Sequence, residues 1–170
     1  MKSGAEPRRL FVISALAIVV VDFITKRIAE RSLLPVPPVD VLGDWVRLRL
    51  VYNQGAAFGL NLGPLQRWIF LIIAVVAVVL LWRLARSSAA GDRLRQISCG
   101  LVAGGAAGNL VDRIRSPQGV VDFIDVGVGM TRWPTFNVAD IGVSCGAIAL
   151  AVSLWLEDAR RARAGAVSST

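Results

Sequence analysis

The stretch Ser98-Cys-Gly-Leu-Val-Ala-Gly-Gly-Ala-Ala-Gly108 is apolar and uncharged, and Gly100, Gly104 and Gly108 recur in it at intervals of four. Small residues at this spacing lie on one face of a helix and allow neighbouring helices to approach closely, as in helix pairs within membranes. Asn109 and Asp112 follow directly. The stretch therefore predicts a central helix of a bundle, with polar groups at its carboxyl end.

The composition around this stretch is that of a membrane protein. Hydrophobic residues make up 55% of the 170 residues and charged residues 18%, and the mean hydropathy is +0.60. A soluble domain is more charged and less apolar, so the excess apolar surface is expected to face lipid. The net charge of +7 then reflects topology and anionic headgroups, and no nucleic-acid partner is predicted. The chain has no histidine, which excludes imidazole catalysis and histidine-bound metals.

Four apolar, uncharged segments occupy residues 10–21, 68–82, 96–111 and 141–156. Crossing a bilayer takes roughly 20 helical residues, so we extend the spans to about 10–24, 66–83, 96–112 and 138–157. The fold class predicted is an integral membrane, mainly α protein: a four-transmembrane-helix bundle forming one domain over residues 1–170. No small-residue cleavage site follows Val21, so the first span is expected to remain uncleaved.

The basic residues predict the orientation of this bundle. Ten of the 19 Lys and Arg residues lie in the N-terminal segment, the connection 83–95 and the tail 160–163. By the positive-inside rule, both termini and that connection are cytoplasmic. The segments 25–65 and 113–137 are then extracytoplasmic.

Two short runs within the extracytoplasmic segments have the character of strands. Residues 45–52 alternate apolar side chains with Arg47 and Arg49, which predicts a strand with one solvated face. Residues 120–126 are rich in β-branched side chains. Together they predict a small sheet on the outer membrane surface, and the Pro-rich residues 33–38 predict a rigid turn or linker.

An up-down bundle brings the chain's carboxylates together at the outer face. Asp22, Asp112 and Asp140 stand at the ends of three spans, and Asp122 and Asp125 lie in the connection between the last two. Ionisable residues at membrane depth are costly and usually mark a site. Carboxylates gathered where water is scarce share protons, so that one can activate water while its partner protonates a leaving amine. This arrangement is typical of an aspartic hydrolase.

Purely structural roles compete with catalysis for several of these residues. Asn137 is placed to cap the last helix, with Asp140 in its first turn. Asp22 and Lys26, four residues apart, are spaced for an ion pair across one helical turn. The sequence leaves these alternatives open.

Three further residues have structural interpretations of their own. Asp112 stands at a helix carboxyl end, where the dipole disfavours an anion, so we expect a structural ion pair with Arg113 or Arg115. Asp125 is predicted to be a solvated loop charge. Asn53 is predicted to end a strand or form a turn.

Thiol chemistry and a serine–lysine dyad are both disfavoured. Cys99 belongs near the cytoplasmic end of the third span and Cys145 near the outer end of the fourth, roughly 12 Å apart in depth at 1.5 Å per residue, so no disulfide is expected, and thiols buried in apolar surroundings are inert. A Ser–Lys dyad would need Lys26, which has no serine nearby in sequence, although Ser144 is able to approach it in the fold.

Five blocks of sequence, in order, resemble those of the lipoprotein signal peptidase family, also called signal peptidase II. The blocks cover nearly the whole chain: Asp22-Phe-Ile-Thr-Lys26, Tyr52-Asn-Gln-Gly-Ala-Ala-Phe58, Gly104-Gly-Ala-Ala-Gly-Asn-Leu-Val-Asp-Arg113, Val120-Val-Asp-Phe123 and Phe136-Asn-Val-Ala-Asp140. The resemblance implies a multi-pass aspartyl endopeptidase of the bacterial inner membrane, active near the periplasmic face. It would cut signal peptides from prolipoproteins, before a cysteine that carries a diacylglyceryl group.

The resemblance also assigns roles to residues. It implies that Asp122 and Asp140 are the catalytic pair, a choice over Asp112 and Asp125 that reasoning from the residues alone leaves open. Positions that would line the substrate site are Asn53, Asn109, Arg113 and Asn137. Positions that would support it are Asp22, Lys26, Gly105 and Asp112. The implied partners are lipidated prolipoproteins and membrane lipids, the expected state is a monomer, and neither metal nor organic cofactor is expected.

Two other function classes compete with the protease. In a proton-coupled small transporter, Asp22, Asp112 and Asp140 would form a relay, but relay carboxylates also occur near the bilayer midplane, and here all cluster at one end. A non-enzymatic assembly subunit built on the glycine-rich helix would leave the carboxylates unexplained.

Overall fold

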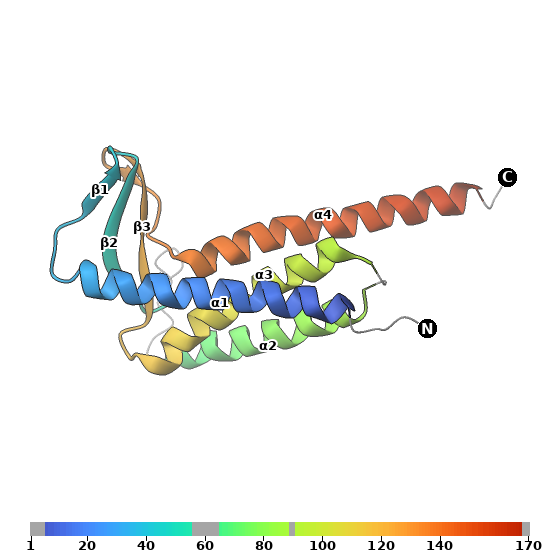
Figure 1. Ribbon diagram of the computed structural model, residues 1–170, viewed down its shortest axis with the longest axis horizontal. Coiled ribbons are helices and arrows are strands. Elements are labelled where there is room, and N and C mark those ends of the chain that lie inside the picture. Colours follow the sequence, from blue (N-terminus) through green and yellow to red (C-terminus); the bar gives the residue numbers. More distant parts are fainter. Residues whose placement is uncertain (1–5, 56–64, 89–90, 168–170) are drawn as a thin grey trace.

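Four long helices run alternately in opposite directions in the computed structural model, which describes residues 6–55, 65–88 and 91–167 (Figure 1). They are α1 (Glu6–Ser32), α2 (Gln66–Arg86), α3 (Arg93–Arg115) and α4 (Val138–Val167). The end of α2, the start of α3 and both chain termini lie at the same end of the bundle (Figure 1). The sheet lies across the opposite end, as an up-down bundle requires.

Helix α3 packs against all three other helices, and its glycines permit the close approach. A Cβ atom on Gly104 would stand 2.6 Å from the carbonyl oxygen of Ala15 in α1, and one on Gly108 would stand 2.7 Å from the Asp22 carboxylate. Both distances are shorter than real Cβ contacts. The prediction that the glycine-rich helix is central is confirmed.

The helices are longer than the predicted spans, most of all at the ends of α1 and α4. α1 continues to Ser32, two turns beyond the predicted end at 24, and α4 continues to Val167, beyond 157. The turn of α1 that contains Lys26 stays helical because this side chain is buried and paired within the bundle. Among the described residues, α2 over Gln66–Arg86 and α4 over Val138–Ala164 are long and apolar enough to cross a membrane.

The two predicted strands are confirmed and belong to a four-stranded antiparallel sheet. Its strands are β1 (Val39–Leu42), β2 (Val46–Asn53), β3 (Val120–Val128) and β4 (Thr131–Arg132), in the order β1-β2-β3-β4. In the central pair, Val46 lies opposite Val126 and Tyr52 opposite Val121. Strands β1 and β4 were not predicted, because runs of two and four residues carry too little periodicity.

The alternation of residues along β2 separates an apolar face of the sheet from a charged one. Leu48 and Leu50 pack into a cluster around Ala29 and Leu33 at the end of α1. On the other face, Arg47 pairs with Asp40 at 2.8 Å and with Asp44. The sheet is therefore anchored to the bundle through its apolar face.

The segment that leads into α4 is tied to the edge of β3. The carbonyl oxygen of Phe136 accepts hydrogen bonds from the backbone of Phe123 and Ile124 at 3.0 and 2.8 Å, and the Phe136 N–H donates to the oxygen of Ile124 at 3.0 Å. Asn137 and Asp140 follow directly. These bonds bring the first turn of α4 beside Asp122.

Candidate active site

Asp122 lies on β3, with 2% of its surface exposed, and receives hydrogen bonds from two asparagine amides. Asn53, the last residue of β2, donates to one carboxylate oxygen at 2.9 Å. Asn137 donates to the other at 2.7 Å. A buried carboxylate needs such donors, since desolvation without them is costly.

Asp140 and Asn137 cap the start of α4 reciprocally. The Asn137 side-chain oxygen accepts from the Asp140 backbone N–H at 3.0 Å, and the Asp140 carboxylate accepts from the Asn137 N–H at 3.1 Å. The capping role predicted for Asn137 is confirmed. The same two side chains also reach the candidate site, because Asn109 of α3 donates to the other Asp140 oxygen at 2.9 Å.

Each of the three asparagines is held by its oxygen, so its amide nitrogen points at a carboxylate. Asn53 accepts from the Gly55 N–H at 2.9 Å, which is the turn predicted for it. Asn109 accepts from the Lys26 ammonium at 2.9 Å, and Asn137 accepts from α4 as described. The amide nitrogens then donate to Asp122 and Asp140. The three asparagines therefore both stabilise local structure and hold the two carboxylates.

Lys26 connects this network to two further carboxylates, Asp22 and Asp112. Its ammonium lies 2.7 Å from Asp22 and 2.9 Å from Asp112, in addition to its bond to Asn109. Asp22 in turn accepts from the backbone N–H of Ala139 in α4 at 2.8 Å. The predicted pair of Asp22 and Lys26 is confirmed, and it also connects α1 to the start of α4.

The ion pair expected for Asp112 exists and includes Arg115, one of the two predicted partners, but the closest cation is Lys26, which was not predicted for it. The main cation is Lys26 of the neighbouring helix, whereas Arg115 lies 4.0 Å away. Arg113 does not serve, because its guanidinium stands over the Phe70 ring, 5.2 Å from the centroid. A residue of another helix reaches the buried carboxylate more directly than an arginine in the same exposed turn.

Arg67 of α2 was not among the predicted site residues. It donates to the carbonyl oxygens of Arg113 and Ile114 at 2.6 and 3.1 Å, and so caps the end of α3. The sequence signal is a basic residue just before an apolar helix, at the level where another helix ends. Arg67 thereby fixes the turn that presents Arg113.

The prediction for Asp125 is wrong. This residue is buried and forms an ion pair with Arg132 at 3.0 Å. The turn between β3 and β4 folds Arg132 back onto it, a contact that depends on the strand that the sequence did not reveal. Asp125 therefore stabilises the sheet at a distance from the Asp122 network.

Gly105 supports the site through packing. A Cβ atom there would collide with the Ala139 carbonyl oxygen and stand 2.7 Å from the Val143 side chain. Only glycine lets the first turns of α4 approach α3 this closely. Residues 56–58, in the second sequence block, lie outside the described residues.

The remaining sequence alternatives do not form sites. Cys99 and Cys145 are both free, as predicted, although Cys145 is exposed rather than buried. Ser144 is exposed, while the three donor positions of Lys26 are directed at Asp22, Asp112 and Asn109. A Ser–Lys dyad is therefore not assembled.

Comparison with known proteins decides the family. Residues 14–156 match the family model described as signal peptidase (SPase) II. The chain belongs to this family. Proteins named lipoprotein signal peptidase are 45% identical in Rhodococcus jostii, over 84% of this chain and 70% of the relative. In Treponema denticola the identity is 39%, over 86% of this chain and 88% of the relative.

A solved structure agrees with the sequence relatives. It is described as a bacterial membrane enzyme and superposes on this signal peptidase II family member with a TM-score of 0.77, at 27% identity, over 88% of this chain and 90% of the other. The mainly helical fold with its small antiparallel sheet is thus shared with a membrane enzyme.

The Asp122 carboxyl in this family member is protonated more readily than an ordinary one. Its pKa is raised to about 6, chiefly by burial and also by the nearby charge of Asp140, while the amide donors of Asn53 and Asn137 and the charge of Lys26 act in the opposite direction. A carboxyl that retains its proton toward neutral pH is suited to general acid catalysis.

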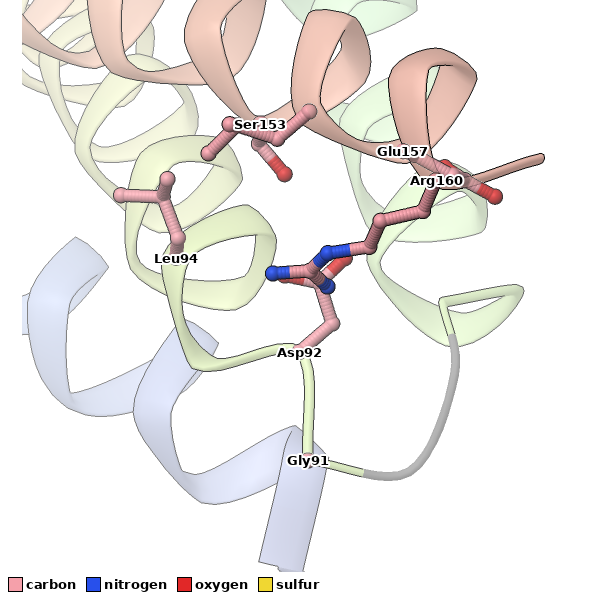
Figure 2. Close-up of a pocket in the computed structure, with 7 residues that line it drawn as sticks. Gly91, Asp92, Leu94, Ser153, Glu157 and Arg160 are labelled. Carbon is pink, nitrogen blue, oxygen red and sulfur yellow. The ribbon is translucent and has the colours of Figure 1, made fainter. Parts of the chain in front are cut away.

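A cavity of about 300 Å³ lies at the other end of the bundle, where α4 passes the start of α3 (Figure 2). Its carboxylates are already engaged: Asp92 caps α3 by accepting from the Arg95 N–H at 3.0 Å, and Glu157 pairs with Arg95 and Arg161. The lining residues are Gly91, Asp92, Leu94, Ser153, Leu156, Glu157 and Arg160. This cavity is remote from the Asp122 network and contributes no group to it.

The raised pKa of Asp122 predicts a pH dependence of stability. Between its ordinary value of 3.8 and about 6, the folded state binds more protons than the unfolded state, so the free energy of unfolding falls as pH rises, by up to roughly 3 kcal/mol. The change in melting temperature of the purified protein from pH 4 to pH 7 should therefore be more negative for the wild type than for Asp122→Asn. Equal differences for both would contradict this prediction.

Proposed function

We propose that this chain is an aspartic endopeptidase that removes the signal peptide from diacylglyceryl-modified prolipoproteins by cutting before the lipidated cysteine. One observation supports it above all: two carboxylates, Asp122 from β3 and Asp140 from α4, are held in one network of asparagine amides. Membership of the signal peptidase II family and relatives named lipoprotein signal peptidase supply the reaction and the substrate class.

In the proposed mechanism the two aspartates divide acid and base work. Asp140 lies in the first turn of α4, at the positive end of the helix dipole, and accepts a proton from the attacking water. The hydroxide adds to the scissile carbonyl carbon, and Asp122 gives its proton to the leaving amine as the C–N bond breaks. Asp122 is suited to that step because burial keeps its carboxyl protonated to about pH 6.

The residues around the pair would bind the substrate. Arg113 is a cation that lies over the Phe70 ring, and it is proposed to contact polar groups of the substrate backbone or lipid. Asn53, Asn109 and Asn137 are proposed to line the same site while they orient the carboxylates.

We also propose that the chain is a single inner-membrane domain with four spans. At about 1.5 Å per residue, the 27 residues of α1 and the 23 of α3 measure roughly 40 and 35 Å, enough for a bilayer core of about 30 Å. Large apolar side chains such as Leu16, Ile72 and Ile148 are exposed on the helices, as lipid-facing residues would be. The sheet and the aspartates would then lie on the periplasmic side, with both termini cytoplasmic, and the protein is proposed to act as a monomer.

The proton-coupled transporter is not supported. The chain belongs to a peptidase family, and the carboxylates Asp22 and Asp112 are engaged with Lys26 rather than forming a relay. The assembly-subunit alternative likewise has no counterpart in these relatives.

The proposed topology predicts that Gly91 and Ser116 lie on opposite sides of the membrane. Gly91 precedes α3 and Ser116 follows it, so a reporter active only in the periplasm should be active when fused after Ser116 and inactive when fused after Gly91. A cytoplasmic reporter should give the reverse pattern. Fusions that report the same side for both positions would disprove the span through α3.

The proposed mechanism predicts that Asp122→Asn and Asp140→Asn each abolish cleavage in a folded protein. The amide retains shape and some hydrogen bonding but exchanges no proton with water, so each rate should fall by at least ~10²–10⁴-fold. The double variant should be about as inactive as either single variant, because the pair acts as a unit. Cleavage of a purified lipidated prolipoprotein, followed by gel shift, measures this.

Asp112→Asn and Asp125→Asn are the matched controls for the catalytic pair. Each variant removes a buried carboxylate that is ion-paired. We therefore expect a lower melting temperature, with the turnover of the remaining folded enzyme little changed. If Asp122→Asn retained normal turnover while either control lost it in a folded protein, the choice of Asp122 would be wrong.

The diacylglyceryl group is expected to be required for efficient cleavage. A site at the end of the bundle, beside helices with exposed apolar side chains, places acyl chains against lipid while the scissile bond reaches the carboxylates. Purified enzyme should therefore cleave a lipidated prolipoprotein much faster than its unlipidated form in the same detergent. Equal rates on both substrates would contradict the proposed specificity.

A further inference from the structure

We propose that Lys26 is a positioning residue for the aspartic reaction: its ammonium holds the Asn109 oxygen, so that the Asn109 amide nitrogen faces Asp140. The inference rests on the proposed function and deepens it. Among the described residues, Lys26 forms no hydrogen bond with either member of the proposed catalytic pair. The inference nevertheless assigns it a specific effect on Asp140.

The surroundings of Lys26 give its ammonium three defined partners. The side chain is 1% exposed, and its nitrogen lies within 2.7 to 2.9 Å of Asp22, Asp112 and Asn109. An ammonium has three protons and no acceptor, so each proton has one acceptor. Desolvation of the charge is offset by the two carboxylates, and the third bond remains for the amide.

The orientation of Asn109 follows from these contacts. Because Lys26 only donates, the atom of Asn109 that faces it has to be the oxygen, and the nitrogen then donates to Asp140 at 2.9 Å. The Asn137 amide also donates to the same Asn109 oxygen, at 3.1 Å. If the Asn109 amide were flipped, its N–H groups would face the donors of Lys26 and Asn137, and its oxygen would face the Asp140 carboxylate.

The acidic groups that interact with Lys26 come from three elements. They are Asp22 of α1, Asp112 of α3 and, through its charge alone, Asp122 of β3. Asp22 and Asp112 together neutralise the lysine charge. The orientation of Asn109, rather than bare charge, is therefore the effect that Lys26 has on Asp140.

A solely structural ion pair would have a different experimental signature. If Lys26 only neutralised Asp22 and Asp112, its removal would lower stability but leave turnover per folded molecule unchanged. If it orients Asn109, loss of the donor should lower kcat in a folded enzyme, because a misplacement of about 1 Å costs up to roughly 10²-fold.

The experiment compares two variants with equal charge. Lys26→Met/Asp112→Asn removes one positive and one negative charge, so the cluster retains its net charge but loses the donor to Asn109. Lys26→Gln/Asp112→Asn has the same charges and restores an N–H donor. We expect the Met variant to lose roughly 10²-fold in kcat with KM nearly unchanged, and the Gln variant to recover most of that loss at a similar melting temperature.

The controls separate this inference from the proposed function. Asp125→Asn/Arg132→Met removes a buried ion pair from the sheet that carries Asp122 and should leave kcat unchanged. If the Met and Gln variants are equally active or equally impaired, the positioning role is overturned. If Asp122→Asn cleaves normally, the proposed function fails instead.

A second measurement covers a Met variant that does not fold. Lys26→Leu/Asp112→Asn, which also lacks a donor to Asn109, is then combined with Asn109→Ala, and kcat is measured for each variant alone and for the combination. If Lys26 acts through Asn109, its substitution costs little once Asn109 is absent, so the effects are non-additive. Additive effects would overturn the proposal.

Discussion

The buried ammonium of Lys26 is the contact on which the rest of the site depends. It neutralises carboxylates from α1 and α3 and holds an amide that faces α4. Removing the ammonium would leave two buried carboxylates without their cation, which is strongly destabilising. Asp22 extends the same cluster to the backbone of α4. The cluster thereby holds α1, α3 and α4 together at the level of the first turn of α4, which contains Asp140.

Close helix packing makes this polar cluster possible. The glycines of α3 bring the backbones of α1 and α4 near enough for short side chains to meet. Larger residues there would separate the helices and open the cluster to water, where ion pairs and amide bonds are worth less. The glycine face and the carboxylates therefore depend on each other. Close packing buries the polar cluster, and burial raises the pKa of Asp122.

Two ion pairs depart from the predictions for one physical reason. Asp125 was expected to be solvated but pairs with Arg132 of an unpredicted strand, and Asp112 has, besides the predicted Arg115, a closer cation in Lys26 of another helix. Periodicity and helix dipoles describe what a segment does alone. They do not say which side chain of another segment fills the space beside it.

The sequence by itself determined the four helices, the two central strands, the central place of the glycine-rich helix and the convergence of the aspartates at one end. These follow from local apolar patterns and from alternation of direction along the chain. Only the tertiary structure decided that Asp122, rather than Asp112 or Asp125, shares the amide network with Asp140. The reason is that the backbone bonds between Phe136 and β3 set the register of α4 against the sheet, and such long-range register leaves no mark in either segment alone.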